Sequence, residues 1–384
     1  MKNIVNLGNV ATYINGYAFK PSDWAEDGTP IIRIQDLTGN SYQMNRFKGI
    51  VDSKYDVNSG DVLISWSASL GVYVWNRGNA VLNQHIFKVV FDKEEVDKDF
   101  FVFQIDNLLK RAANQAHGAT MRHLTKPVFD ALPFYLPDIK TQRLISSKLN
   151  LIVHLIEDHH EQLKKLDELI RSRFIEMFGD PQSNCYNWKI VPLKDVMVGG
   201  ALNGYFTKPQ NYDIEGNVGV ICVSDVVNRK YTNVNALRRA FASEKDLQKY
   251  CVKYGDMLFC RSSLVKEGIG KASIIPPHTE NDILFECHVI KITLDMSRVI
   301  PEYLQALSIT DFFRIQVIRQ SKTATMTTIG QKDIASVNIL LPPMELQKRF
   351  TEFSAQIDKS KLAVQKSLDE LEILKKSLMQ TYFG

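Results

Sequence analysis

The sequence predicts an α+β protein in which two mixed α/β domains are separated by an antiparallel coiled-coil pair of long helices, with an internal pseudo-two-fold repeat. Three observations support this prediction. Several motifs occur twice, in the same order, along the 384-residue chain. Each copy ends in a long segment whose apolar residues are spaced alternately by four and three, which is typical of a coiled-coil helix. The segment before each of these is rich in short β-branched runs, which are typical of strands.

The repeated motifs place the domain boundaries. The pairs, first copy before second, are Asn15-Gly16-Tyr17 and Asn203-Gly204-Tyr205, Gly60-Asp61-Val62-Leu63 and Gly255-Asp256-Met257-Leu258, Ala119-Thr120-Met121 and Ala324-Thr325-Met326, and Leu136-Pro137 and Leu341-Pro342. Each long segment then begins near a Gln-Arg or Gln-Lys pair and ends in Phe-Gly, at Phe178-Gly179 and Phe383-Gly384. We therefore expect a first domain over 1–137, a helical region over 138–180, a second domain over 181–341 and a second helical region over 342–384.

The composition is that of an ordinary soluble protein, with 45% hydrophobic and 23% charged residues. The N-terminus lacks the apolar stretch of a signal peptide and no run approaches 18 apolar residues, so we expect a cytoplasmic protein without a membrane segment. The five cysteines include no CxxC pair, which argues against a disulfide framework and against a zinc site. A formal net charge of +4 permits nucleic-acid binding but does not require it.

Strands and short helices are expected in both domains. The expected strands cover 31–34, 62–65, 72–75 and 86–91, and then 218–223, 257–260 and 288–294. One short helix is expected in each domain, over 98–116 and over 301–317. Asn15-Gly16 and Asn203-Gly204 are the strongest turn signals, because Asn and Gly tolerate the positive φ that both central positions of a type I′ turn require.

The two long helices are the clearest elements. Asp138 is the expected N-cap of the first, and Gly179 with Pro181 is its expected stop signal. Its stripe is Ile145, Leu149, Ile152, Ile156, His159, Leu163, Leu166 and Ile170, and that of the second is Phe350, Phe353, Ile357, Ser360, Val364, Ser367, Leu371, Leu374 and Leu378. A helix from 141 to 178 would be roughly 57 Å long at about 1.5 Å per residue, so we expect a domain at each end of the pair. His159 is expected to interrupt the seam and fix its register, and a metal or switch site at His159-His160 is the alternative.

Motifs for catalysis are incomplete or missing. Gly268-Ile269-Gly270-Lys271 resembles the end of a phosphate loop, but Val265 stands where the first glycine is required. The sequence contains no HExxH or GxSxG motif, and no Asn- or Asp-Pro-Pro-aromatic loop of the amino-methylating enzymes. We therefore expect a chain without catalytic or metal-ligating residues. A self-contained nuclease or methyltransferase and a coiled-coil interaction scaffold without DNA contact remain the alternatives.

Two loop regions in each copy carry side chains that suit DNA. One precedes each long helix, and the other follows the Gly-Asp strand. The flanks of the loops agree between the copies while the loops differ, as expected for two modules that bind two different short sequences. The candidate side chains in these loops are Ser65, Trp66, Ser67, Ser69, Thr120, Arg122, His123, Thr125, Lys126, Arg261, Ser262, Ser263, Lys266, Lys322, Thr325, Thr327 and Thr328. Weaker candidates elsewhere are Arg33, Gln35, Arg229 and Lys230, since Arg and Gln can make bidentate contacts to bases. Ordinary solvated loops are the alternative interpretation.

With these motifs the sequence resembles the specificity subunits of type I restriction–modification systems. The resemblance rests on the paired Leu-Pro…Gln-Arg/Lys…Phe-Gly helices, the two Gly-Asp-[Val/Met]-Leu strands and the Ala-Thr-Met loops. It covers essentially the whole chain in the family's order of target recognition domain, central helical region, second recognition domain and distal helical region. A specificity subunit of a related fused restriction–modification type is the alternative.

The resemblance implies a non-catalytic subunit that binds double-stranded DNA at a bipartite, asymmetric target. Each recognition domain would bind one half-site, and the helix pair would set the spacer. It also implies two methyltransferase subunits as partners, and restriction/translocase subunits bound through them. S-adenosylmethionine, ATP and Mg²⁺ would be used by these partners and not by this chain, and no membrane would be involved.

Overall fold

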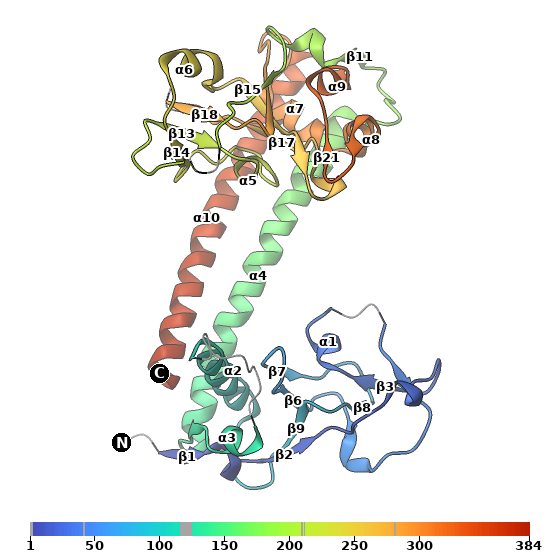
Figure 1. Ribbon diagram of the computed structural model, residues 1–384, viewed down its shortest axis with the longest axis vertical. Coiled ribbons are helices and arrows are strands. Elements are labelled where there is room, and N and C mark those ends of the chain that lie inside the picture. The colour runs from blue at the N-terminus through green and yellow to red at the C-terminus, as the bar shows by residue number, and fades with distance from the viewer. Residues whose placement is uncertain (1–2, 41–42, 116–124, 209, 211, 280–281) are drawn as a thin grey trace. The chain divides into compact units, whose positions relative to one another are not determined.

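The computed structural model describes residues 3–40, 43–115, 125–208, 210, 212–279 and 282–384. The chain forms two compact units (Figure 1). Unit 1 comprises Met1–Glu161 with Gln365–Gly384, and unit 2 comprises Gln162–Val364. Each unit therefore combines one mixed α/β domain with a part of both long helices, and the predicted mixed α/β class is confirmed. The boundaries predicted at 137, 180 and 341 stay predictions.

Unit 1 contains two four-stranded sheets and one two-stranded sheet. In the two-stranded sheet β1 (Ile4–Asn6) is antiparallel to β10 (Pro133–Tyr135). The first four-stranded sheet has the order β2 (Thr12–Asn15), β9 (Ile86–Val90), β6 (Val62–Ser65) and β7 (Gly71–Val74). The second has the order β4 (Arg46–Phe47), β3 (Thr29–Ile32), β8 (Ala80–Leu82) and β5 (Asp56–Val57). The β3–β8 pair is parallel, so this domain is not a simple antiparallel meander.

The helices of unit 1 close its main core. They are α1 (Ile34–Leu37), α2 (Lys98–Gln115) and α3 (Lys126–Asp130), with 3-10 turns at Leu7–Asn9, Pro21–Asp23 and Ser53–Tyr55. Phe100, Phe129 and Phe134 are fully buried there, beside residues of the first sheet. Leu149 from one long helix and Phe383 from the other belong to the same cluster, so the helices are part of the core of the domain.

Unit 2 contains corresponding sheets and one additional small sheet. The pair is β11 (Lys189–Pro192) with β22 (Asn338–Leu341), and the four-stranded sheet runs β12 (Leu202–Asn203), β19 (Val289–Thr293), β15 (Asp256–Cys260) and β17 (Ala272–Ile274). A further sheet runs β14 (Arg238–Ala240), β13 (Val218–Ile221) and β18 (Ile283–Phe285), with β13 parallel to β18. The small sheet runs β16 (Ser262–Ser263), β21 (Thr327–Thr328) and β20 (Lys322–Thr323).

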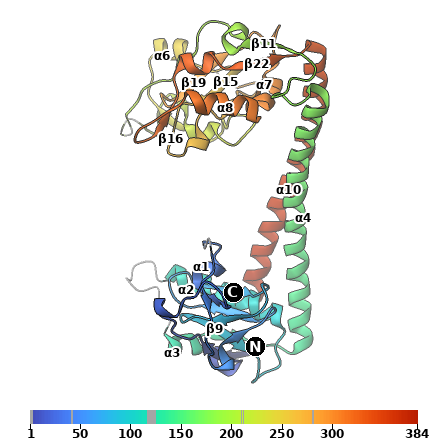
Figure 2. The same ribbon diagram turned by 90° about the vertical axis from the view of Figure 1, so that its right-hand side faces the viewer.

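The shorter helices of unit 2 cover its sheets. They are α5 (Val223–Val226), α6 (Glu244–Tyr250), α7 (Pro301–Ser308), α8 (Asp311–Gln320) and α9 (Gln331–Ala335), with 3-10 turns at Leu193–Val196 and Lys266–Gly268. Helix α7 contacts β17, and α8 contacts α9 and β22. Figure 2 shows α7, α8 and β22 near one another in unit 2. The single helix predicted over 301–317 is wrong, because α7 and α8 are separate. Thr310 occupies the N-cap position of α8 and Asp311 its first turn, which is a helix-start signal inside the predicted helix.

The duplicated glutamines have the same hydrogen bonds in both units. Gln142 Oε1 accepts from the Asp97 N–H at 2.9 Å, and its Nε2 donates to the carbonyls of Pro137 and Glu95. Gln347 Oε1 accepts from the Ile300 N–H at 2.9 Å, and its Nε2 donates to the carbonyls of Pro342 and Arg298. Both side chains are buried. The Gln motif thus ties the first turn of each long helix to the domain before it. A pseudo-two-fold relation between the complete copies stays a prediction.

The long helices are α4 (Ile139–Phe178) and α10 (Met344–Phe383). Asp138 is the N-cap of α4 as predicted, since its Oδ1 accepts from the Thr141 N–H at 3.0 Å. Gly179, with a φ of +74°, ends the helix as predicted.

The two helices contact each other inside each unit with opposite chain directions. In unit 1, His159 lies 3.0 Å from Ser367, and Leu149 shares a cluster with Phe383. In unit 2, Lys361 Nζ donates to Asp167 Oδ1 at 2.6 Å, and the rings of Phe174 and Phe350 are 5.5 Å apart. A coiled coil over the full length of the pair stays a prediction.

The type I′ turns predicted at the two Asn-Gly motifs are wrong. Gly16 follows β2 and its N–H donates to the Ile86 carbonyl, while the Gly204 N–H donates to the Val289 carbonyl. Neither glycine has a positive φ. A Cβ on Gly16 would lie 2.0 Å from the Asn83 carbonyl oxygen, and one on Gly204 would lie 2.2 Å from that of Glu286. The glycines are needed because another backbone segment passes too close for any side chain.

Two further findings on the described part of the chain concern membrane-spanning helices and the cysteines. Within it, no helix combines the length and the apolar character needed to cross a bilayer. All five cysteines are free thiols.

Candidate nucleic-acid interface

In unit 2 the small sheet brings together the two loop regions that the sequence identifies as separate candidates. Ser262 pairs with Thr328 and Ser263 with Thr327, so the loop after β15 lies against the loop before α10. Lys322 also pairs with Thr328 across β20 and β21. Five predicted residues from two distant segments of the sequence, 262–263 and 322–328, therefore belong to one small sheet.

Some of these residues hold the sheet together and do not face solvent. Ser262 and Thr327 are buried. The Ser262 hydroxyl lies 3.1 Å from His288 Nδ1, and the Thr327 hydroxyl lies 3.0 Å from that of Thr323. Ser263 and Thr328 are half-buried, whereas Lys266, Lys322 and Thr325 are exposed. Among the predicted residues of these two loops, Lys266, Lys322 and Thr325 are therefore the most accessible.

Arg261 stabilises the same loop through hydrogen bonds. Its Nη1 donates to the Cys287 carbonyl at 2.9 Å, and its backbone N–H donates to the His288 carbonyl at 2.8 Å. The Ile329 N–H in turn donates to the Arg261 carbonyl at 3.0 Å. The guanidinium is therefore held at the base of the small sheet, although its Nε has no hydrogen-bond partner.

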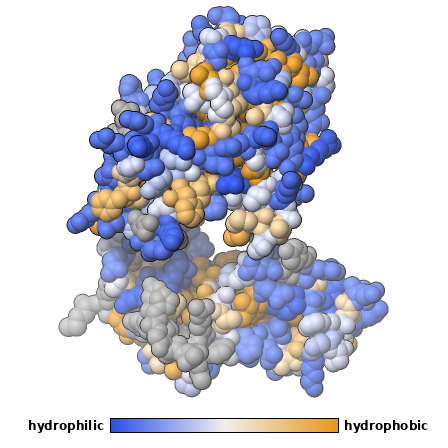
Figure 3. Space-filling view, turned by 45° about the horizontal axis from the view of Figure 1, so that its top comes forward, coloured by the Kyte–Doolittle hydropathy of each residue, from blue (hydrophilic) through white to orange (hydrophobic). Residues whose placement is uncertain are grey.

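The loop after β16 ends in an exposed apolar tip that sequence reasoning did not select. Leu264 is 85% exposed and Val265 is 59% exposed. The surface in Figure 3 is mostly hydrophilic, with apolar residues in small groups. The tip is held in place by hydrogen bonds from the Val265 N–H to the Ser263 hydroxyl and from the Gly268 N–H to the Val265 carbonyl. The sequence signal for this tip was the pair of apolar residues Leu264 and Val265 in a loop of serine and lysine residues.

The corresponding loop of unit 1 is anchored by an aromatic residue. The Trp66 ring stacks on Phe87 with 5.6 Å between centroids, and its Nε1 donates to Asn15 Oδ1 at 3.1 Å. Ser65 and Ser67 are buried, and the Ser65 hydroxyl donates to the Ser69 carbonyl. Ser69 is exposed. Trp66, Ser65 and Ser67 thus shape the loop, and Ser69 is its accessible candidate.

The second candidate region of unit 1 is described only in part. Thr120, Arg122 and His123 lie outside the described residues, as does the whole Ala-Thr-Met motif of this copy. Thr125 is exposed at the N-cap position of α3. Lys126 forms an ion pair with Asp130 at 2.5 Å and lies 5.4 Å above the ring of Tyr13. Burial, and then the charge of Asp130, raise the pKa of Tyr13, so its phenol stays protonated.

The four weaker candidates lie on other elements. Arg33 is half-buried before α1, where its Nε lies 3.3 Å from Asp36 Oδ2, and Gln35 is exposed on α1. In unit 2, Arg229 is exposed. The Lys230 side chain is hydrogen-bonded to α10. Its Nζ donates to the Ser354 hydroxyl at 2.8 Å and to Asp358 Oδ2 at 2.5 Å.

Metal and nucleophile chemistry finds no support in the described residues. Within them no group of three His, Cys, Asp or Glu side chains is arranged to hold a metal ion. Burial raises the pKa of the Cys222 and Cys260 thiols to about 11, so both are protonated at neutral pH and are poor nucleophiles.

Comparison with known proteins finds similarity to one family. Residues 2–168 match the family model of the type I restriction modification DNA specificity domain. The chain is 22% identical over 412 residues to the specificity subunit of the type I restriction enzyme EcoBI of Escherichia coli, covering 99% of this chain and 85% of that protein. Over nearly its whole length the chain is similar to type I restriction–modification specificity subunits.

Further relatives are similar over nearly the whole chain. The MjaVIII specificity subunit of Methanocaldococcus jannaschii is 21% identical over 394 residues, covering 98% of this chain and 90% of that protein. A crystal structure of a type I specificity subunit from M. genitalium has a TM-score of 0.54 at 12% identity, covering 100% of this chain and 96% of that one. A chain from a structure of type I complex assembly has a TM-score of 0.58 at 16% identity, covering 99% and 97%. These structures show the shared fold.

Proposed function

We propose that this chain is a non-catalytic specificity subunit of a type I restriction–modification system. It would bind a bipartite, asymmetric sequence in double-stranded DNA, with one half-site for each recognition domain. The observation that supports the proposal is that each unit carries its own candidate loop on a corresponding strand. The loop after β6 is built around Trp66, whereas the loop after β15 has the tip at Leu264. A common framework with different loops suits two modules that recognise two different sequences.

The helix pair is proposed to set the spacer between the half-sites. Helices α4 and α10 have 40 residues each. At about 1.5 Å per residue this length is about 60 Å, which exceeds the ~34 Å between successive major-groove faces of B-DNA on one side. The opposed contacts of the two helices within each unit support an antiparallel pair that continues through both.

Two methyltransferase subunits are proposed to dock on the chain, and an exposed stripe in unit 1 supports one such docking surface. In unit 1, Leu144, Leu151 and Leu155 on α4 are 55%, 61% and 36% exposed. Their spacing of seven and four places them on one face of the helix, beside the buried stripe that includes Leu149 and Ile156. An uncovered apolar stripe of this kind fits a helix of a partner protein. Restriction/translocase subunits would bind through the methyltransferase subunits, and S-adenosylmethionine, ATP and Mg²⁺ would be used there.

Methylation mapping tests the proposal. The chain is expressed with its methyltransferase subunits, and modified adenines are located by single-molecule sequencing of host DNA. We expect one motif made of two different half-sites separated by a spacer of fixed length without sequence preference. A single uninterrupted motif, or no motif that depends on this chain, would contradict it.

Two alternatives give different results in related experiments. A DNA-free interaction scaffold would show no steep loss of duplex binding as salt is raised, whereas several phosphate contacts require one. A specificity subunit of a fused restriction–modification type would give the same motif but would copurify with a fused partner chain.

A further inference from the structure

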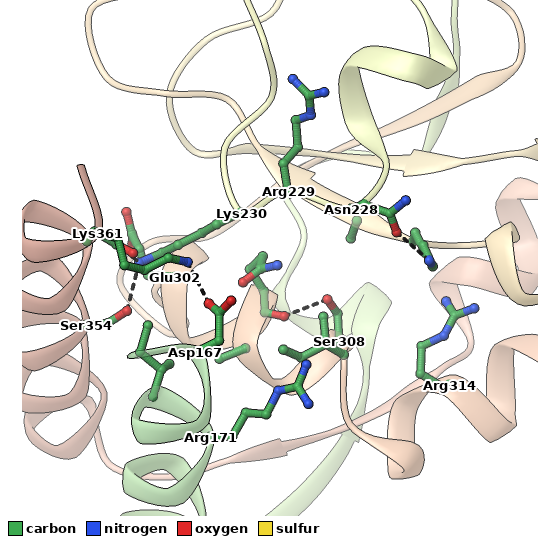
Figure 4. A pocket seen from close by; sticks show the side chains of 17 residues that line it. Asp167, Arg171, Asn228, Arg229, Lys230, Glu302, Ser308, Arg314, Ser354 and Lys361 are labelled. Atoms are coloured by element: carbon green, nitrogen blue, oxygen red, sulfur yellow. Dashed lines mark hydrogen bonds and ion pairs between the residues drawn. The ribbon is translucent and has the colours of Figure 1, made fainter. Parts of the chain in front are cut away.

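A cavity of about 480 Å³ lies within unit 2, between the second recognition domain and both long helices (Figure 4). Its walls come from α4 at Asp167 to Arg171, from α10 at Ser354 to Lys361, from the loop 228–230 and from α7 and α8. Six basic and three acidic side chains line it. The cavity therefore carries an excess of positive charge.

Two ion pairs use part of this charge, one between the two long helices and one between the domain and α10. Lys361 Nζ lies 2.6 Å from Asp167 Oδ1, and Lys230 Nζ lies 2.5 Å from Asp358 Oδ2. The third acid, Glu302, is buried and its Oε1 accepts from the Tyr231 and Tyr254 hydroxyls at 3.2 Å each. Figure 4 places Glu302 on the side of Lys230 and Lys361, whereas Arg314 lies on the opposite side near Asn228.

The other four cations have no carboxylate partner among the described residues. Arg171 and Arg229 are exposed and make no side-chain bond there. Lys271 Nζ donates to the neutral amide of Asn228 at 2.5 Å. Arg314 Nη2 donates to the Glu267 carbonyl at 3.0 Å, while its Nη1 is buried without an acceptor. A buried guanidinium nitrogen without an acceptor costs free energy, and an anion in the cavity would offset part of that cost by pairing with the positive charge of the group.

Arg314 also connects the cavity to the candidate base-contacting loop. The Glu267 carbonyl that it bonds belongs to the 3-10 turn Lys266–Gly268, directly after the exposed tip at Leu264 and Val265. Lys271 follows the same turn. A duplex whose bases face the tip would therefore bring its own backbone close to these cations.

We infer that this cavity is a binding site for the phosphodiester backbone of DNA, held by Arg171, Lys271 and Arg314. The inference rests on the proposed function, because it assigns the phosphates to the DNA that the second recognition domain binds. Guanidinium and ammonium groups are the usual partners of DNA phosphates, and such contacts fix the position of the protein without recognising sequence. The cavity would thus hold the backbone in register while the tip contacts base edges.

Salt titration of DNA binding tests the inference. The variants are Arg171→Gln, Lys271→Gln and the double variant, in the full chain, because neither residue has a carboxylate partner whose loss would endanger folding. The control is Arg349→Gln, an exposed arginine of α10 in unit 2 that does not line the cavity. Each lost phosphate contact should reduce the slope of log K against log salt by about 0.9, and the double variant by nearly twice that. The preferred half-site sequence should not change.

A slope in the double variant equal to that of the wild type would overturn the inference. A second arm titrates wild type and variants with inorganic phosphate and with ATP by calorimetry. Saturable binding that the variants lose, together with an unchanged DNA salt slope, would assign the cavity to a free phosphate compound and also overturn it. The slopes are measured on target and on scrambled duplex. If wild type and Arg349→Gln do not distinguish these two duplexes, the proposed function fails, whereas the phosphate inference is decided by the slopes alone.

Discussion

His159 Nε2 of α4 lies 3.0 Å from the Ser367 hydroxyl of α10, so the polar interruptions of the two predicted apolar stripes meet each other. His159 Nδ1 is buried and has no hydrogen-bond partner among the residues that the structure describes. The pair therefore satisfies one ring nitrogen and leaves the other unsatisfied. Such a contact favours one register of the helices and lowers their stability.

Replacing His159 should therefore stabilise unit 1. His159→Leu removes a buried unsatisfied nitrogen and continues the apolar stripe, so we expect a gain of about 1 kcal/mol in the free energy of unfolding. Urea denaturation of the full chain measures it, with the exposed neighbour His160→Leu as the control. A loss of similar size in His159→Leu would show that the histidine contributes more through Ser367 than it costs.

Gly204 should tolerate no side chain. In Gly204→Ala the new Cβ would meet two backbone carbonyl oxygens of Phe285 and Glu286, at 2.3 and 2.2 Å, and neither is able to move without disrupting the strand. We expect a loss of about 3 kcal/mol or more in the free energy of unfolding. Gly200→Ala is the matched control, because nothing lies within 4 Å of its Cβ position. Equal stability of the two variants would contradict the close approach.

Asp138 should stabilise α4 only while it is ionised. Hydrogen bonds from the Thr141 side chain and N–H lower the pKa of Asp138 below its ordinary value of 3.8. A carboxyl whose pKa falls on folding stabilises the folded state above its ordinary pKa, and this stabilisation is lost as the pH falls through the lowered value. Asp138→Ala should therefore lower Tm at neutral pH, and the difference from wild type should shrink below pH 3.8. Asp158→Ala, on the exposed face of α4, is the control for removal of charge alone.

Leu264 should determine one position of the half-site bound by the second domain. If its exposed side chain contacts a base, Leu264→Ser should change the preference at that position by about 1–3 kcal/mol and leave the first half-site unaltered. Competition binding with duplexes substituted at single base pairs measures the preference. Leu362→Ser is the control, because Leu362 is 72% exposed on α10. A change confined to the first half-site would exclude the assignment.

Local signals account for the parts of the fold that the sequence predicts correctly. Asp138 and Gly179 delimit α4 through bonds and dihedral angles within a few residues, and Lys98 to Gln115 has the period of a helix. The small sheet is different, since Ser262 and Thr328 are far apart in the sequence and no local pattern joins them. For the same reason the sequence offers Lys230 as a weaker candidate for DNA contact but does not indicate its partner Asp358, which lies on α10. Gly16 and Gly204 show that one motif fits both a turn and a close approach.

The spacer should lengthen when both helices lengthen together. Two helical turns, about seven residues, are inserted into α4 near Glu161 and into α10 near Gln365, which keeps the apolar stripes facing each other. Because the recognition domains are untouched, we expect the same two half-sites with a longer spacer, measured by methylation mapping. Exchange of residues 1–137 for the same domain of a relative should, by contrast, change one half-site and keep the spacer. Altered half-sites with the original spacer after the insertion would mean that the helices do not set the distance, and the domains would then have to position each other by direct contact or through their partner subunits.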